Sequence, residues 1–135
     1  MRPSASPVLN LASRLPGRWR LASYEARSEQ GAVRHPMGPD ATGVLQYTGD
    51  GKVSVHIMTR DRARYFAYYG DYEIDEARGA ITHVIELSSD PGFVGARNLR
   101  FAALEGDGER LVLSGPMAFD GEPHTIRVAW VREAD

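Results

Sequence analysis

The sequence predicts an all-β protein, an eight-stranded antiparallel up-and-down barrel with a short N-terminal helix. Three observations predict this fold class. Apolar and polar residues alternate with a period of two from Gly17 to the C-terminus, as in strands with one buried face. Short glycine-containing turns at 49–51, 76–79 and 106–109 separate these runs, as hairpin connections do. The 135 residues make one domain, 1–135, and closing its sheet removes exposed edges, which favours a barrel over the alternative, a sandwich.

The segment before Gly17 predicts a short helix. Ser6 can cap its N-terminus, Pro7 suits the first helical position, and Pro16 ends it. We expect residues 1–5, which precede the cap, to be flexible. The apolar stripe of this helix consists of Val8, Leu9, Leu11, Ala12 and Leu15.

Eight strands follow the helix in this interpretation. Two longer loops, 29–42 and 89–95, interrupt the series of hairpins, and they either form the rim of a barrel mouth or serve as plain connectors. We expect the strands at 17–26, 43–48, 52–59, 65–75, 80–88, 96–105, 111–115 and 125–132.

The short turns indicate which strand residues face the barrel interior. A three-residue loop at 49–51 places His56 on the solvent face of its hairpin. The same reasoning for the next hairpin places His83 inside, directly across from Tyr72. It also pairs Gly70 with Ile85 and Tyr68 with Leu87. The inner residues of these two hairpins are Leu45, Tyr47, Val53, Val55, Ile57, Tyr68, Gly70, Tyr72, Ile74, Ile81, His83, Ile85 and Leu87.

Two further face assignments leave alternatives open. In the hairpin around 106–109 we place Arg100 inside, although the face that carries Leu99 and Phe101 is equally apolar. Tyr65 and Tyr69 point outward if Tyr68 points inward, and they mark either a dimer surface or scattered surface tyrosines. The expected oligomeric state is therefore a monomer or a homodimer.

Buried polar groups on barrel walls need hydrogen-bond partners. Tyr72, His83 and Arg100 form either a structural network in a filled core or the polar part of a cavity that binds a small molecule. In the second case we expect the ligand-binding residues to be Leu45, Tyr47, Val55, Ile57, Tyr68, Ile81, Ile85, Phe101 and Trp19.

Composition and charge exclude several classes of partner. Sixteen lysines and arginines against 18 acidic residues give a net charge of −2, which argues against nucleic acid. The basic and aromatic stretch 60–66 is short, and we interpret it as a solvated loop. No apolar run is long enough for a membrane span, and residues 1–16 lack the apolar core of a secretory signal. We therefore expect a cytoplasmic protein without a membrane partner.

The sequence predicts neither a metal site nor a cofactor. The chain has no cysteine, which excludes disulfides, thiolate nucleophiles and cysteine-based zinc sites. Its four histidines show no paired spacing of the kind that metal-binding motifs use. Ser23 and Ser54 have no evident Ser-His-Asp arrangement, so nucleophilic catalysis is poorly supported.

Several ordered motifs resemble the bacterial and fungal stand-alone lipocalin-like domain family. The resemblance extends from Leu15 to Arg132 and implies an eight-stranded barrel with an internal pocket, with mouth loops at one end and the helix near the other. It also implies that Trp19 packs at the closed end beneath Arg132. The chain has no cysteine and we expect no signal segment, and in both respects it would differ from secreted lipocalins. The motifs are Gly17-x-Trp19, residues 36–47, 51–55 and 69–74, Thr82-His83, and Arg100 with Leu111 and Leu113.

Two functions follow from this interpretation. The first is binding of a small apolar or amphipathic metabolite in the barrel cavity. The alternative is a cofactor-independent isomerase, cyclase or hydratase that acts on a biosynthetic intermediate. In that enzyme, His83 is the general acid or base, Tyr72 donates a proton or orients the ring, and Arg100 holds an enolate or carboxylate.

Overall fold

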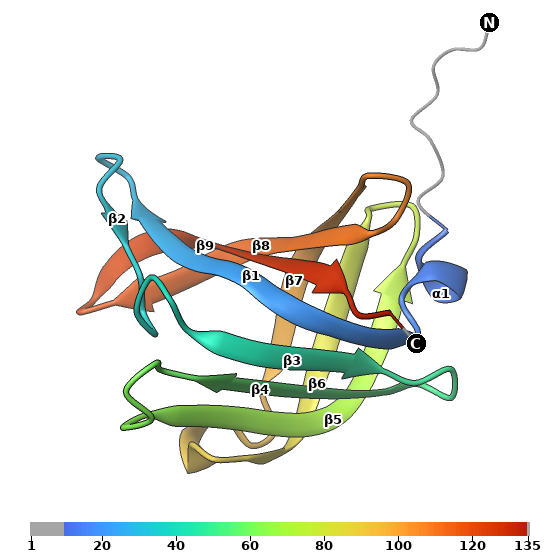
Figure 1. The fold of residues 1–135 in the computed structure, drawn as a ribbon, viewed down its shortest axis with the longest axis horizontal. Helices are drawn as coiled ribbons and strands as arrows, with labels where there is room; N and C mark the ends of the chain where they lie inside the picture. The colour runs from blue at the N-terminus through green and yellow to red at the C-terminus, as the bar shows by residue number, and fades with distance from the viewer. Residues whose placement is uncertain (1–9, 135) are drawn as a thin grey trace, which may run out of the picture.

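The strands of the barrel run antiparallel around one interior, and a single turn of helix lies at one end (Figure 1). The computed structural model describes residues 10–134, so the predictions for Ser6, Pro7 and residues 1–5 lie outside the described residues. The elements are α1 (Leu11–Arg14), β1 (Gly17–Ser28), β2 (Val33–Arg34), β3 (Thr42–Tyr47), β4 (Lys52–Met58), β5 (Tyr65–Asp75), β6 (Ala80–Ser88), the 3-10 helix η1 (Pro91–Phe93), β7 (Arg97–Glu105), β8 (Arg110–Phe119) and β9 (Glu122–Arg132).

Each strand from β3 to β8 pairs with the next along the chain, and β1 pairs with both β3 and β9. The β1–β9 pairing closes the sheet, so the predicted eight-stranded antiparallel barrel is confirmed. β2 is a two-residue strand that pairs with β1 alone and lies outside this ring. No helix among residues 10–134 is both long and apolar enough to span a membrane.

The β8–β9 hairpin is longer than the sequence predicts. We expected its strands to end at Gly115 and to begin at Thr125, but the ladder continues as far as the pair Phe119 and Glu122. A two-residue turn with positive φ at Asp120 joins them, as in other tight hairpins. The extension includes two prolines, which a sheet tolerates at its edges and rims. The extra length places Met117 and Phe119 beside the barrel mouth.

A bulge in the β5–β6 hairpin changes the predicted register. Gly70 pairs with Ile85 as expected, but Tyr68 pairs with Ser88, so the predicted pairing of Tyr68 with Leu87 is wrong. Leu87 lies on the outer surface and is 60% exposed. A Cβ atom at Gly70 would lie 1.9 Å from the carbonyl oxygen of Val84, so the strands can approach this closely only at a glycine.

The end of the barrel beside α1 is closed. Leu15 is fully buried, and its carbonyl accepts a hydrogen bond from the Trp19 indole at 3.0 Å. The Arg132 guanidinium lies 4.2 Å from the centre of the Trp19 ring, the stacking that the family resemblance implies. The Glu76 carboxylate accepts hydrogen bonds from two free N–H groups at the start of α1, those of Leu11 and Ala12. This carboxylate ties the helix to the β5–β6 turn.

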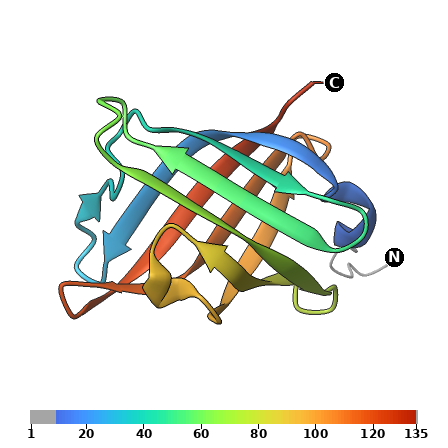
Figure 2. The same ribbon diagram turned by 90° about the horizontal axis from the view of Figure 1, so that it is seen from below.

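The opposite end of the barrel forms the mouth. Figure 2 shows α1 at one end of the molecule, with β2 and the tip of the β8–β9 hairpin at the other. The two long loops contribute to this end, since Pro36, Met37, Asp90 and Phe93 line the cavity described below. Of the two interpretations of these loops, the structure therefore favours the rim of a mouth.

Candidate functional site

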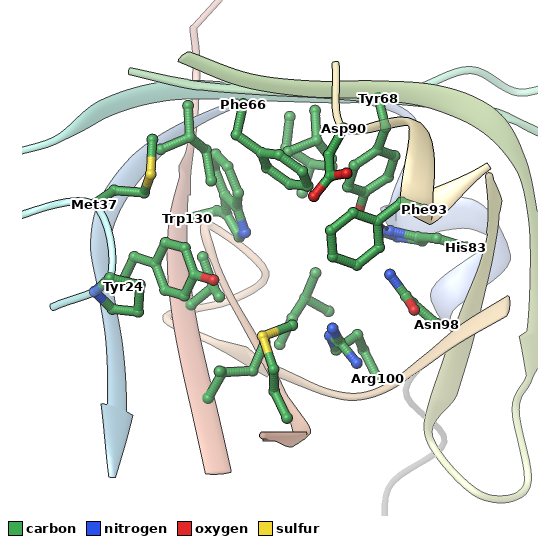
Figure 3. Close-up of a pocket in the computed structure, with 18 of the residues that line it drawn as sticks. Tyr24, Met37, Phe66, Tyr68, His83, Asp90, Phe93, Asn98, Arg100 and Trp130 are labelled. Atoms are coloured by element: carbon green, nitrogen blue, oxygen red, sulfur yellow. Dashed lines mark hydrogen bonds between the residues drawn. The ribbon is translucent and has the colours of Figure 1, made fainter. Parts of the chain in front are cut away.

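The barrel encloses a cavity of about 360 Å³ (Figure 3). Its wall is mainly apolar, and strands from all sides of the barrel supply it. Two aromatic rings lie toward the mouth: Phe93 from η1 packs edge to face against Phe66 from β5, with their centres 5.5 Å apart. The apolar lining consists of Pro36, Met37, Leu45, Val55, Ile57, Phe66, Phe93, Leu113, Met117, Phe119, Ile126, Val128 and Trp130.

Six of the predicted site residues line this cavity: Leu45, Val55, Ile57, Tyr68, His83 and Arg100. The assignment of Arg100 to the inner face is therefore correct, and it explains why another prediction fails. Phe101 follows Arg100 directly, and neighbouring strand residues point to opposite faces. The prediction that Phe101 lines the cavity is wrong, because Phe101 lies on the outer surface and is 42% exposed.

The other predicted residues lie outside the cavity lining. Tyr47, Ile81 and Ile85 are buried in the wall. Trp19 belongs to the closed end, where α1 and Arg132 enclose it. The Tyr72 hydroxyl donates a hydrogen bond to the carbonyl of Thr48 at 2.7 Å, in the β3–β4 turn at that same end. The predicted grouping of Tyr72 with His83 and Arg100 is therefore not found within the cavity.

A buried histidine is held between two tyrosines on one side of the cavity. The Tyr47 hydroxyl lies 2.7 Å from Nε2 of His83, and the Tyr68 hydroxyl lies 2.6 Å from Nδ1. Burial, with a smaller effect from Arg100, lowers the pKa of His83 to about 3. The imidazole is therefore neutral at physiological pH, and both of its nitrogens are occupied. Tyr47 lies behind the histidine, whereas Tyr68 faces the cavity.

The Arg100 guanidinium faces the cavity and has no carboxylate partner among the described residues. Its one hydrogen bond within residues 10–134 goes from Nη1 to the carbonyl of Leu99 at 2.9 Å, and no salt bridge in that range includes it. Burial lowers the pKa of Arg100, and the nearby tyrosines oppose this shift. An arginine nevertheless stays cationic at any physiological pH. The cavity therefore contains a positive charge with unused donors.

Five more residues bring polar groups to this space, and the sequence analysis predicted none of them as site residues: Tyr24, Arg64, Asp90, Asn98 and Trp130. Figure 3 shows the Tyr24 hydroxyl and the Trp130 indole nitrogen on the side of the cavity formed by β1 and β9. Trp130 is 2% exposed, and its Nε1 has no hydrogen-bond partner among the residues that the structure describes. Burial raises the pKa of Tyr24, so its hydroxyl also keeps its proton.

Most of the polar groups around the cavity can act as hydrogen-bond donors. Arg100 and Trp130 can only donate, and the hydroxyls of Tyr24 and Tyr68 can donate as well as accept. Burial raises the pKa of Tyr68, which keeps it protonated. Asp90 supplies a carboxylate from the mouth loop. Within the described part of the chain, no cluster of three or more histidine or acidic side chains could hold a metal ion.

The structure thus defines a small closed β-barrel with a mainly apolar cavity that opens at one end. A family model described as a lipocalin-like domain matches residues 16–65 and 60–132. The chain therefore belongs to the lipocalin-like domain family. No curated protein matches the sequence significantly.

Two solved structures are similar in fold. The lipoprotein YedD from Klebsiella pneumoniae shares 15% identity over 90% of this chain and 73% of its own, with a TM-score of 0.46. The siderocalin Ex-FABP shares 10% identity over 89% of this chain and 71% of its own, with a TM-score of 0.41. Both TM-scores are below 0.5, so the family assignment depends on the family model.

Proposed function

We propose that the barrel binds a small amphipathic molecule, with its apolar body against the cavity wall and an anionic end at Arg100. The observation that carries this proposal is the Arg100 guanidinium, which faces the cavity with a backbone carbonyl as its one partner in the described structure. Arg100 is partly buried, and a charge held away from water without a counterion is costly. A bound anion offsets that cost. Carboxylate and sulfonate groups offer a guanidinium two oxygens at once.

The wall supports the apolar part of this ligand. A volume of about 360 Å³ lies within the range of small-molecule sites. Each methylene group that a ligand transfers from water to such a wall contributes about 0.8 kcal/mol. The apolar body thus supplies most of the affinity, and Arg100 selects and orients the polar end.

The acid–base alternative has less support. It requires His83 to exchange a proton with a substrate, yet tyrosine hydroxyls occupy both of its nitrogens. It also requires Tyr72 at the reacting centre, and that hydroxyl is bonded to Thr48 at the closed end. No observation favours turnover, so binding is the function proposed.

A pair of fluorescent probes tests the proposal. 8-Anilinonaphthalene-1-sulfonate carries a sulfonate, and N-phenyl-1-naphthylamine has the same apolar skeleton without it. We expect both to bind with increased fluorescence, and Arg100→Met to weaken binding of the sulfonate probe by about tenfold, or about 1.4 kcal/mol. The neutral probe should bind Arg100→Met as it binds the unchanged protein.

The matched control is Arg97→Met on the same strand, since Arg97 is exposed and pairs with Glu73 outside the barrel. Circular dichroism of each variant verifies that it is folded. Equal affinities of the sulfonate probe for the unchanged protein and for Arg100→Met would contradict the proposal. So would equal losses in the Arg97 and Arg100 variants.

A further inference from the structure

We infer that His83 carries its proton on Nδ1, and that this tautomer makes the Tyr68 hydroxyl an obligatory hydrogen-bond donor to the ligand. The inference deepens the proposed function and rests on it. It assigns the ligand a polar end that accepts from Tyr68 as well as from Arg100, such as the two oxygens of a carboxylate. His83 and Tyr47 are then positioning residues, because they act through Tyr68.

The first step is a count of protons. A neutral imidazole has one N–H donor and one bare nitrogen that accepts. Burial keeps the phenols of Tyr47 and Tyr68 protonated, so each has one hydrogen to donate. The two contacts, at 2.7 and 2.6 Å, use one hydrogen each. The imidazole and the two phenols together supply three hydrogens, so one stays free. In either tautomer, one tyrosine donates to the histidine, and the other accepts and keeps its own hydrogen free.

The second step compares where that free hydrogen lies. If Nε2 carries the proton, the free hydrogen belongs to Tyr47, which is 1% exposed and lies behind the histidine, away from the cavity lining. Its hydroxyl has no second hydrogen bond within residues 10–134. Its nearest aromatic neighbour, Tyr72, packs edge to face with ring centres 4.8 Å apart. In this tautomer the buried Tyr47 hydroxyl has no acceptor for its hydrogen, and the protein bears the full cost of removing that donor from water.

If Nδ1 carries the proton, the free hydrogen belongs to Tyr68. Tyr68 lines the cavity, and Figure 3 shows its ring beside His83 at the edge of that space. A ligand or a water molecule can accept the hydrogen there. Both nitrogens of His83 and the hydroxyl of Tyr47 are satisfied at the same time. Only the Nδ1–H tautomer gives each of these buried polar groups a hydrogen-bond partner, so we assign this tautomer to His83.

The third step concerns the ligand. In this tautomer Tyr68 has already accepted a hydrogen bond from His83, so it faces the cavity as a donor. Arg100 and Trp130 face the same space and can only donate. A ligand whose polar end is an ammonium would find a like charge at Arg100. A carboxylate end can accept from Tyr68 and Arg100 together.

Nitrogen NMR tests the tautomer directly. In long-range proton–nitrogen spectra, Nε2 couples to both ring C–H protons, and a bare ring nitrogen resonates far downfield of a protonated one. We expect the doubly coupled nitrogen of His83 to be the downfield one near neutral pH. An upfield or averaged signal for this nitrogen would overturn the inference. Signals of His83 are those that persist in variants of His35, His56 and His124.

Probe binding tests the consequence for the ligand. Tyr68→Phe should weaken binding of 8-anilinonaphthalene-1-sulfonate by about tenfold and leave N-phenyl-1-naphthylamine unchanged. The matched control is Tyr69→Phe, since Tyr69 is the next residue on β5 and lies on the outer surface. If Arg100→Met weakens the sulfonate probe but Tyr68→Phe does not, this inference fails and the proposed function stands. If neither variant weakens it, both fail.

Discussion

Gly115 on β8 leaves the room that the Arg100 side chain occupies. A Cβ atom at Gly115 would lie 3.1 Å from Nη1 and 3.2 Å from Cδ of Arg100. These separations are tighter than ordinary van der Waals contact, so a side chain at Gly115 would push the guanidinium aside by a few tenths of an ångström. The position of the positive charge that Arg100 supplies to the cavity thus depends on the absence of a side chain at Gly115 in the neighbouring strand.

Gly115→Ala should therefore move Arg100 while keeping its charge. We expect the affinity for an anionic probe to fall by several-fold, approaching the loss in Arg100→Met, and stability to fall by about 1–3 kcal/mol from overpacking. Fluorescence titration with the sulfonate and neutral probes measures the first effect, and urea unfolding measures the second. An unchanged sulfonate affinity would show that the guanidinium tolerates the displacement.

The two tryptophans should respond differently to the same substitution. Trp19→Phe removes the hydrogen bond to Leu15 and weakens the stacking of Arg132, so we expect a loss of about 2–4 kcal/mol in the free energy of unfolding. Trp130→Phe removes a donor that has no partner within residues 10–134, which offsets part of the lost packing. Urea denaturation of both variants measures the difference, and equal losses would contradict this account.

The buried histidine should make stability depend on pH. The pKa of His83 is about 3 in the folded protein, below its usual value near 6.5, so the unfolded chain binds more protons between these values. The free energy of unfolding should therefore decrease as pH falls from about 6.5 toward 3. His83→Gln removes this titration, so the stability advantage of the unchanged protein over the variant should shrink by about 1.4 kcal/mol per pH unit across that window. Unfolding curves at several pH values check the slope, and a constant difference would refute it.

The bulge in the β5–β6 hairpin should not tolerate a side chain. Gly70→Ala would place a Cβ atom 1.9 Å from the Val84 carbonyl oxygen, so we expect destabilisation of about 3 kcal/mol or more. Gly49→Ala is the matched control, since a Cβ atom there would meet nothing within 4 Å. The control should change stability by less than about 0.5 kcal/mol. Thermal and urea unfolding of the pair measure this, and similar values for both would contradict it.

Several of the site residues that the sequence predicted correctly lie in hairpins with a regular strand register. The β3–β4 and β7–β8 hairpins contain no irregularity, so Leu45, Val55 and Arg100 lie on the expected faces. The failures at Leu87 and Tyr24 occur next to bulges, one in β5–β6 and one between Leu21 and Ser23. A bulge depends on how closely two strands approach. The alternation of apolar and polar residues along a single strand contains no information about that distance.

The barrel closure is a second reason why Tyr24 was not predicted, and it also explains the omission of Trp130. Tyr24 pairs with Val128 and Leu21 pairs with Trp130, across strands about a hundred residues apart. No turn connects β1 to β9 directly, so no loop length fixes their register in the sequence. The turns therefore could not indicate that the Trp130 indole faces the cavity, although the sequence did predict the strand that carries this residue.

The closed end beside α1 has a consequence for kinetics. With Leu11, Leu15 and Trp19 fully buried there, a molecule in the cavity leaves by the route through which it entered. Changes that only loosen the loops at 35–40 and 89–95 would speed association and dissociation by the same factor. Under the proposed function, those loops would then set the residence time of the ligand, whereas Arg100 and the apolar wall would set its equilibrium constant. On the same proposal, selection could therefore alter how long a ligand stays bound without altering its affinity.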